Sequence, residues 1–323
     1  MRGSLSLGNR LGRLPRRGFS LVELIIALSL GVIVLGAAIG YLIREMRNLA
    51  GGDLRQSVSR NGRYVGNSLR HDLQQAGIAI KSTTTFGTVA TWSGTQGDTL
   101  VVLYVPYNPT VAPAHPLLPP PGVDNPLPSG GTCGPYCVDV AKDPAVPLEL
   151  QVGDLARLQV LDTRRLILIE DIVETSDTSV AVTFTQAPLI LRRTAGLDGD
   201  LLLDRFGTFV QKLATVVYYL DEQAQLFRAP NLNLNGSPAG HILAYGVESF
   251  DVKLIFNDGD ELDRADPGDE DDTNDYDDVV AVKVLATFKA DRTDPRVNEG
   301  QLLRRNYEWT VSPRNLRYEK RRL

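Results

Sequence analysis

The chain has 323 residues, a formal net charge of −5 and a hydrophobic share of 43%. This length is enough for one large or two small folded units with a real core. The acidic balance opposes non-specific nucleic-acid binding, which rests on neutralising phosphates with Lys and Arg. The sequence has three histidines and no nucleophile-elbow, zinc-protease or phosphate-loop motif, so it gives no support for an enzyme.

The N-terminal region places one carboxylate directly before a long apolar run. Residues 24–43 carry no charge over twenty positions, about the length that a helix needs to cross a ~30 Å hydrocarbon core. Glu23 precedes this run immediately. A carboxylate at that depth costs about 2.5–3.5 kcal/mol on insertion scales, so Glu23 is predicted to be functional and to have a partner.

The basic residues before the apolar run set its orientation. By the positive-inside rule this end stays in the cytoplasm, and everything after Ile43 is exported. A secretory signal peptide fits less well, because the run exceeds the usual 7–15 residues and no A-x-A site follows before Arg44. A plain single-span anchor explains the span but not the residues before it, and the hydropathy fits a buried soluble helix poorly. The five basic residues are Arg2, Arg10, Arg13, Arg16 and Arg17.

Helical periodicity continues beyond the apolar run. Apolar residues recur mostly at three, four or seven positions among polar neighbours, at Leu54, Val58, Val65, Leu69, Leu73 and Ala76. We expect residues 19–43 to form the membrane helix and residues 44–80 its amphipathic continuation. The helix is predicted to end near Gln75 with Gly77 as a C-terminal cap. Gly51, Gly52 and Gly62 are points where it can bend.

The remainder of the chain, residues 81–323, is predicted to be a β-rich head. Short β-branched runs follow one another, separated by turn signals and without helical periodicity long enough for parallel crossovers. The fold class is therefore α+β, with a long N-terminal helix packed on a mainly antiparallel head. The runs lie at 99–105, 156–161, 165–170, 179–185, 209–220, 243–256 and 278–289.

A proline-rich stretch at residues 108–147 interrupts this pattern. Proline lacks the backbone donor of a strand, so we expect a surface excursion that makes a subunit contact or is a tolerated insertion. It contains the only cysteines, Cys133 and Cys137, which an exported compartment allows to form a disulfide. Their three-residue spacing is not the two-residue redox spacing, and a zinc site lacks further ligands.

A second excursion at residues 257–278 is strongly acidic. Alternating carboxylates with Gly and Asn suit Ca²⁺, which takes six to eight oxygen ligands and would relieve their repulsion. No complete EF-hand spacing is present, and a solvated, disordered loop is the alternative. The candidate ligands are Asp258, Asp260, Asp263, Asp269, Asp271 and Asp275.

The C-terminal segment at residues 304–323 is locally basic. Its positive charges could contact DNA or another surface, whereas a frayed, solvated tail is the alternative. The candidate contact residues are Arg314, Arg317, Lys320, Arg321 and Arg322.

The sequence from Gly18 to Glu23, followed by the apolar run, resembles the leader junction of type IV prepilins and type II secretion pseudopilins. The resemblance implies that a prepilin peptidase removes residues 1–18, cutting after Gly18, and that Phe19 is then N-methylated. Glu23 becomes the fifth mature residue, where it would pair with the N-terminal ammonium of a neighbouring subunit. Cleavage removes five arginines and no acid, which takes the net charge from −5 to −10.

Further stretches narrow the resemblance to the PilW class of minor pilins and the related J-type pseudopilins. They lie at residues 68–77, 217–220, 226–228, 245–250 and 312–316. The implied function is a minor pilin that primes or supports a type IV pilus for adhesion, twitching motility or DNA uptake. A J-class pseudopilin and a pilus-associated adhesin or DNA-binding pilin are the alternatives.

The same resemblance implies partners and a location. The partners are other minor pilins and the major pilin, contacted through the N-terminal helix, together with the prepilin peptidase and the inner-membrane assembly platform. Before assembly the helix lies in the lipid bilayer of the inner membrane, with the head in the periplasm. Assembly then moves the subunit into a pilus or pseudopilus at the cell surface.

Overall fold

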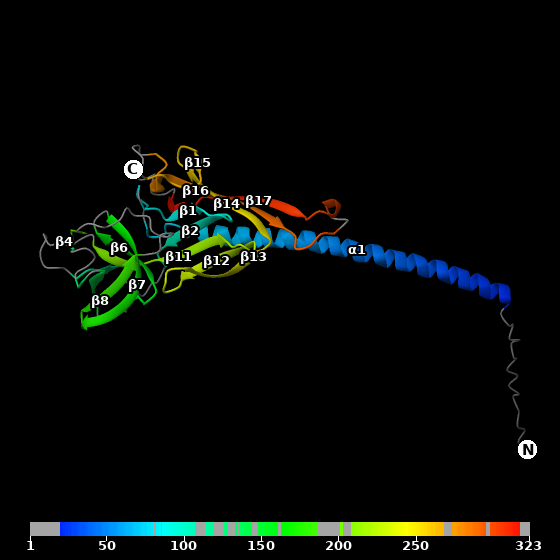
Figure 1. Cartoon of the computed structure of the whole chain (residues 1–323), viewed down its shortest axis with the longest axis horizontal. Coiled ribbons are helices and arrows are strands. Elements are labelled where there is room, and N and C mark those ends of the chain that lie inside the picture. The colour runs from blue at the N-terminus through cyan, green and yellow to red at the C-terminus, as the bar shows by residue number, and fades with distance from the viewer. Residues whose placement is uncertain are drawn as a thin grey trace, which may run out of the picture. The chain divides into compact units, whose positions relative to one another are not determined.

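A computed structural model divides the chain into two compact units, residues 1–53 and 54–323. Helix α1 (Leu21–Leu73) belongs to both, because its first part lies in the first unit and its last turns lie in the second (Figure 1). The structure describes residues 20–80, 82–84, 86–106, 114–118, 126–127, 133–134, 136–143, 148–160, 163–186, 201–202, 208–267, 273–294 and 298–316.

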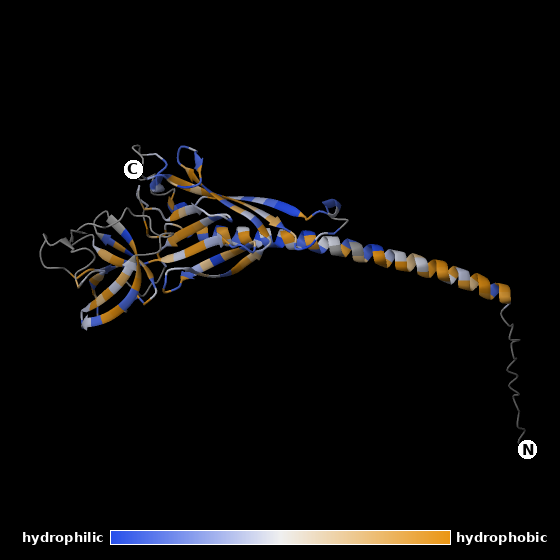
Figure 2. Ribbon diagram, in the orientation of Figure 1, coloured by the Kyte–Doolittle hydropathy of each residue, from blue (hydrophilic) through white to orange (hydrophobic). Residues whose placement is uncertain are grey.

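The described part of the first unit, residues 20–53, contains the apolar part of α1. Its side chains from Leu21 to Ile43 are exposed, Figure 2 colours this stretch as mostly hydrophobic, and no charged residue interrupts it from residue 24 to residue 43. A helix that is apolar on all sides and has no protein core against it needs an apolar environment from elsewhere. By length and composition α1 is the one helix among the described residues that could cross a membrane.

The second unit consists of antiparallel sheets (Figure 1). Five strands pair in the order β1 (Val89–Ser93), β2 (Asp98–Tyr104), β11 (Ala214–Leu220), β12 (Gln225–Leu232) and β13 (Pro238–Tyr245). Four pair in the order β15 (Glu261–Leu262), β14 (Val247–Phe256), β16 (Val279–Lys289) and β17 (Arg304–Val311). The short 3₁₀ helices η1 (Tyr276–Asp278) and η2 (Asn298–Gly300) lie in the connections on either side of β16.

A third sheet has six strands, in the order β3 (His115–Pro116), β10 (Phe209–Lys212), β6 (Leu155–Val160), β7 (Thr163–Ser176), β8 (Ser179–Gln186) and β5 (Cys137–Ala141). The two-residue strands β4 (Pro126–Leu127) and β9 (Leu201–Leu202) form a separate pair. Every pairing between described strands is antiparallel. The α+β prediction is confirmed.

The last turns of α1 supply one face of the main core. Leu54, Val58, Val65, Leu69 and Leu73 are all buried, and they join one cluster with strands of the five-stranded and four-stranded sheets. Their spacing keeps them on one side of the helix, so that side is covered by sheet while the other remains exposed. The predicted amphipathic pattern therefore marks the packing face of α1 correctly.

Strand β2 is buried on both faces. Leu100 and Val102 belong to the core shared with α1, whereas Val101 and Leu103 belong to a second core that includes Leu155 of the six-stranded sheet. This double burial explains why its sequence is a continuous apolar run rather than an alternating one.

Gly62, named above as a point where α1 can bend, has a packing role in the structure. A Cβ atom on Gly62 would lie 2.4 Å from ring carbons of Tyr307, and one on Gly66 would lie 2.4 Å from Nε1 of Trp309. The two rings come from alternate positions of β17 and stack on each other, with centroids 5.5 Å apart and planes 11° from parallel. The glycines allow this aromatic pair to reach the helix backbone.

The end of α1 also differs from the prediction. The helix stops at Leu73 and continues as turns to Ala79, so Gly77 lies beyond the last helical turn. Gly77 has a φ of +73°, which glycine adopts readily, and its N–H donates to the carbonyl of Leu103 on β2 at 3.1 Å. Gly77 therefore connects the turns that follow α1 to the five-stranded sheet.

Two predicted strands are each divided into two. Leu213 separates β10 from β11 within the predicted run 209–220, and β10 and β11 belong to different sheets. Gly246 separates β13 from β14 within 243–256, with φ +68° and no room for a Cβ, which would lie 2.6 Å from the carbonyl oxygen of Lys289. A glycine at that corner lets the chain leave one sheet and enter the next.

The expectation that residues 108–147 contain no ordinary sheet is wrong. β5 pairs with β8 along the edge of the six-stranded sheet, and Val138 and Val140 are completely buried. β3 pairs with β10 at the opposite edge. β5 itself contains no proline, and β3 tolerates Pro116 by lying at an edge, where one side of the strand makes no ladder bonds. Cys133 and Cys137 form a disulfide at the start of β5.

Replacing Cys133 and Cys137 with serine is expected to lower the free energy of unfolding by no more than about 2 kcal/mol, since so short a loop has little closure entropy to lose. The backbone pairing of β5 with β8 remains and holds the strand in place. Denaturant unfolding of wild type and variant, each with and without reductant, checks this. Wild type under reductant should match the variant, and global unfolding of the variant would contradict the prediction.

Candidate functional site

Glu23 lies in the first turn of α1 and makes a local contact. The N–H of Glu23 donates to Oγ of Ser20 at 3.1 Å, and the N–H of Ser20 donates to the Glu23 carboxylate at 3.5 Å. This reciprocal pair is a capping box, for which the sequence signal is Ser-x-x-Glu. Sequence reasoning assigned Glu23 to assembly and missed this second role. Gly18 and Phe19 lie outside the described residues.

A buried ion pair connects α1 to the five-stranded sheet. The guanidinium of Arg228 on β12 donates to both carboxylate oxygens of Asp72, with Nε–Oδ2 at 2.6 Å and Nη2–Oδ1 at 2.8 Å. The hydroxyl of Tyr218 on β11 donates to Oδ2 of the same carboxylate. The side chain of Asp72 is 2% exposed, so its charge has been almost wholly removed from water.

The electrostatics of this site follow from the burial. Burial, followed by the charge of Asp72, raises the pKa of Tyr218 and keeps its hydroxyl protonated as a donor. The hydrogen bond to Asp72 raises the pKa of Arg228, so its positive charge is secured. Three groups with fixed roles as donor and acceptor make a structural anchor rather than a site that moves protons.

Sequence reasoning did not single out Asp72, although a signal was present. Asp72 lies between Leu69 and Ala76 on the apolar side of the helix, where a carboxylate needs a buried partner. The partners come from the stretches at 217–220 and 226–228, so three of the family-like stretches meet at one carboxylate. The contact at Asp72 gives these three stretches a shared structural role, which is to hold α1 against the five-stranded sheet.

The other two family-like stretches also hold α1. Asn61 donates from Nδ2 to the carbonyl of Tyr245 at 3.3 Å, in the stretch 245–250. Asn315 donates to the carbonyl of Ala76 at 3.1 Å, and Leu316 packs near Gly77. The four stretches outside α1 therefore all contact the helix or the turn after it, and they fix its last part in the second unit.

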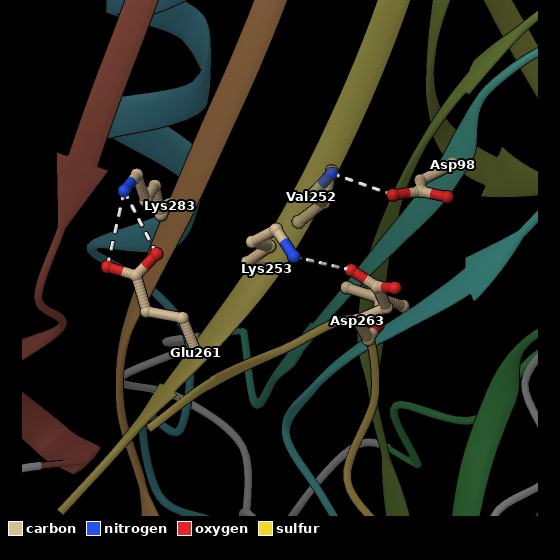
Figure 3. Close-up of polar contacts among 7 residues, drawn as sticks. Asp98, Val252, Lys253, Glu261, Asp263 and Lys283 are labelled. Atoms are coloured by element: carbon tan, nitrogen blue, oxygen red, sulfur yellow. Dashed lines mark hydrogen bonds and ion pairs between the residues drawn. The ribbon is translucent and has the colours of Figure 1, made fainter. Parts of the chain in front are cut away.

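The acidic excursion is partly ordered by lysines (Figure 3). Asp263 pairs with Lys253 at 3.0 Å, and Glu261 pairs with Lys283 at 2.9 Å. Asp98 of β2 accepts the backbone N–H of Val252 at 2.8 Å beside them. These contacts use the strands β14 and β16, so the described part of the excursion is a folded edge of the four-stranded sheet rather than a disordered loop.

No three histidine, cysteine or acidic residues in the described part of the chain are close enough to hold a metal ion. Of the predicted ligands, Asp258, Asp260 and Asp263 are exposed, and Asp275 is buried. Asp269 and Asp271 lie outside the described residues. The calcium site stays a prediction.

The basic C-terminal segment begins as a strand, which corrects the expectation of a solvated tail from residue 304. Arg304 on β17 pairs with Glu248 at 2.6 Å, and Arg305 donates to Oγ of Ser59 on α1 at 2.7 Å. Arg314 is exposed after the strand. Arg317, Lys320, Arg321 and Arg322 lie outside the described residues.

The histidines do not form a catalytic arrangement among the described residues. His71 is exposed on α1 and shares a hydrogen bond with Gln75, and His241 is exposed on β13. His115 on β3 is buried, and this burial lowers its pKa below the usual 6.5, with the charge of Glu149 opposing the shift.

Acidification is expected to destabilise the second unit through His115. The unfolded chain takes up a proton as the pH falls below 6.5, whereas the folded chain resists it, so stability is complete above pH 6.5 and declines below it. Thermal melting of wild type and His115→Gln at pH 7.5 and 5.5 measures this contribution. The variant should lose less stability over that interval, and equal losses would contradict the prediction.

The comparisons with known proteins concern mainly the N-terminus. Residues 13–39 match the model of the prokaryotic N-terminal methylation motif. The chain carries this methylation motif. It contains the predicted cleavage position Gly18, the predicted methylation position Phe19 and Glu23.

The search of curated proteins found no match. Among solved structures, a type IV-like pilin from Thermus thermophilus is similar, with 10% identity over 81% of this chain and 97% of that chain. Its TM-score is 0.35, so this likeness carries no argument about the fold. The motif, the apolar helix and the antiparallel head support a type IV pilin-like protein, which is a structural subunit and not an enzyme.

Proposed function

We propose that the chain is a minor pilin of the PilW class, which primes or supports a type IV pilus with other minor pilins and the major pilin. The supporting observation is the methylation motif at residues 13–39, joined to a helix whose apolar side chains from Leu21 to Ile43 have no core of their own. In a filament the apolar surfaces of neighbouring helices cover one another.

The proposed sequence of events starts in the inner membrane. The prepilin peptidase cuts after Gly18, Phe19 is methylated, and the assembly platform moves the processed subunit into the filament. Glu23 then pairs with the N-terminal ammonium of a neighbour, which offsets two charges in an apolar surrounding. A J-type pseudopilin would use the same chemistry.

The capping box gives this proposal a sharp test, because it separates two roles of Glu23. Gln also serves at this position of a capping box, so Glu23→Gln keeps the cap and removes the charge. Glu23→Ala removes both, and Ser20→Ala removes the cap partner and keeps the charge. If the charge is needed for assembly, both Glu23 variants should remain in the membrane while Ser20→Ala assembles.

The readout is the fraction of processed chain in sheared filaments against the membrane fraction. Processing is measured on the same samples by intact mass, so a failure of cleavage is not mistaken for a failure of assembly. Normal assembly of Glu23→Gln would contradict charge pairing and reduce Glu23 to a helix cap.

A further inference from the structure

Strand β17 leaves one edge of the four-stranded sheet open. It pairs with β16 along its other side for all eight residues, in a register without a shift. Among the described residues no strand pairs with its outer edge, and no backbone hydrogen bond outside the sheets reaches it. It contains neither proline nor glycine. An edge of this length and regularity is a template for a further strand.

The other edges of the described sheets are short, irregular or covered. β13 contains Pro238 and Gly240 and pairs with β12 through two register shifts. β1 has five residues, whereas β3, β4, β9 and β15 have two each. The outer side of β5 is occupied by an antiparallel bridge between Val140 and Leu117. β17 is therefore the one long and regular edge in the described part of the sheets.

The register of β17 shows which of its backbone groups point outward. The N–H of Ala290 donates to the carbonyl of Leu303 at 2.9 Å, whereas the N–H of Lys289 donates to Gly246 on the side of β14. Leu303 therefore faces β16, and so do the odd-numbered residues that follow it in β17, since these groups alternate along a strand. The residues whose N–H and C=O point outward are Arg304, Asn306, Glu308 and Thr310.

The charged side chains of β17 do not close this edge. Arg304 and Glu308 form ion pairs with neighbouring strands of the same sheet, and Arg305 donates to Ser59 on α1. Charged residues protect an edge when they stand in the way of an incoming strand. Here they are held by partners on the two faces of the sheet, so the outward backbone groups remain accessible.

The helix surface beside β17 is positively charged. β17 contacts α1 at Ser59 and Gly66, and Arg63 and Arg70 each lie four residues after one of these positions, which makes them its neighbours on the helix surface. Both arginines are exposed, and no ion pair between described residues includes them. The only acid between residues 54 and 73 is Asp72, which is buried. A strand added to β17 would therefore lie beside uncompensated positive charge.

We propose that the outer edge of β17 binds an extended, acidic segment of another pilin subunit as an added strand. Hydrogen bonds to the outward backbone groups supply affinity that does not depend on sequence, as in other cases of strand addition. Arg63 and Arg70 supply the preference for acidic side chains, because a guanidinium forms charge-assisted hydrogen bonds with a carboxylate. The inference rests on the proposed assembly function and adds to it a site for a neighbouring subunit.

Segments of this chain itself are less suitable occupants. Residues 317–323 carry four basic residues and one acid, so the arginines of α1 would repel them. The acidic excursion at residues 257–278 begins and ends beside β15 and β14, and β15 lies at the opposite edge of the sheet from β17. A different subunit is brought close when the apolar part of α1 packs in the assembly, and β17 lies against the same helix.

The test measures the binding of labelled peptides to the full chain in detergent, by fluorescence anisotropy at low salt. The probe is a peptide of about eight residues in which Val and Glu alternate. One matched peptide has Lys in place of Glu, and another carries N-methyl groups that remove its backbone donors. The Val-Glu peptide should bind about tenfold more tightly than the Val-Lys peptide, and N-methylation should abolish binding.

Variants of the chain locate the binding site. Asn306→Pro removes an outward N–H and keeps the ladder with β16, so it should weaken binding about tenfold, whereas Asn306→Ala should not. Arg63→Glu/Arg70→Glu should weaken binding of the acidic peptide to a similar degree. Arg264→Glu is the matched control, because Arg264 is exposed beyond β15 at the opposite edge of the sheet. Equal melting temperatures for wild type and variants exclude misfolding as the cause.

The occupant in cells is identified with a photo-crosslinking residue in place of Thr310. The expected adduct joins this position to an acidic segment of a different pilin subunit. Undiminished peptide binding by Asn306→Pro, equal binding of the Val-Glu and Val-Lys peptides, or adducts that contain only copies of this chain would each overturn the inference. Cleavage after Gly18 and assembly of the Glu23 variants are measured separately, so a negative result here leaves the proposed function standing.

Discussion

Replacing Asp72 with alanine is expected to lower the free energy of unfolding by about 3–5 kcal/mol. The substitution leaves the partly buried guanidinium of Arg228 without its counter-charge and removes the acceptor of the Tyr218 hydroxyl. Breaking such a pair from one side is costly because the surviving charge stays partly removed from water and the fully buried Tyr218 hydroxyl loses its acceptor. Denaturant unfolding followed by circular dichroism measures the loss.

Companion variants separate the charge from the packing. Asp72→Asn keeps an acceptor for Tyr218 but removes the charge, so its loss should be smaller than that of Asp72→Ala. The double variant Asp72→Leu/Arg228→Leu removes both charges and should be more stable than Asp72→Ala alone, as expected for coupled residues. The single variants Asp72→Leu and Arg228→Leu complete the comparison. If the double variant loses as much free energy of unfolding as these two together, the ion pair is not coupled and the prediction is contradicted.

Gly66→Ala is expected to lower the free energy of unfolding by about 1–3 kcal/mol, the usual cost of overpacking. The new Cβ would lie 2.4 Å from Nε1 of Trp309, and the indole cannot move freely because it is stacked on Tyr307. The substitution would stabilise an isolated helix, since alanine is a better helix former than glycine. Packing against Trp309 predicts a loss of stability and helix propensity predicts a gain, so the sign of the change in the free energy of unfolding tests the packing directly.

Gly52→Ala is the matched control for this prediction. It lies on the same helix with no atom within 4 Å of the added Cβ, so the change should be neutral or raise stability by up to about 1 kcal/mol. Trp309 fluorescence should shift in Gly66→Ala and remain constant in Gly52→Ala. A stabilised Gly66→Ala would show that the aromatic pair does not require the glycine.

The helix and most strands could be predicted from the sequence because burial imposes a period. The six apolar positions from Leu54 to Ala76 all become buried, and the alternating run in β16 becomes a strand with one buried face. Strand β2 was recognisable as a continuous apolar run. These patterns depend only on the spacing of neighbouring residues, so they can be read from a single sequence.

The features that the sequence did not reveal have a common physical cause. In each case the local structure depends on contacts with residues that are distant in the sequence. Gly62 looks like a flexible point in the sequence until the ring of Tyr307 on β17 is placed against it. Strand β5 contains no proline but lies among prolines, and its pairing with β8 becomes visible only in the folded sheet. Asp72 could have been noticed as a carboxylate on an apolar face, but its partners are 146 and 156 residues away.

The candidate site was more predictable than the contacts of the head. The residues from Gly18 to Glu23 form a continuous motif at the edge of an apolar run, so no tertiary information is needed to recognise it. The capping role of Glu23 was equally local and follows from Ser20 three residues earlier. The surfaces that select partners depend on the folded arrangement of the head and leave no comparable local pattern.

The most direct test of the account is the N-terminus of the membrane-extracted protein, determined by intact mass and N-terminal sequencing for wild type and Gly18→Ala. The account predicts a wild-type chain that begins with N-methylated Phe19 and an uncleaved Gly18→Ala chain that keeps its leader. A wild-type chain that begins at Met1, or beyond Ile43, would contradict processing as a prepilin and with it the proposed function.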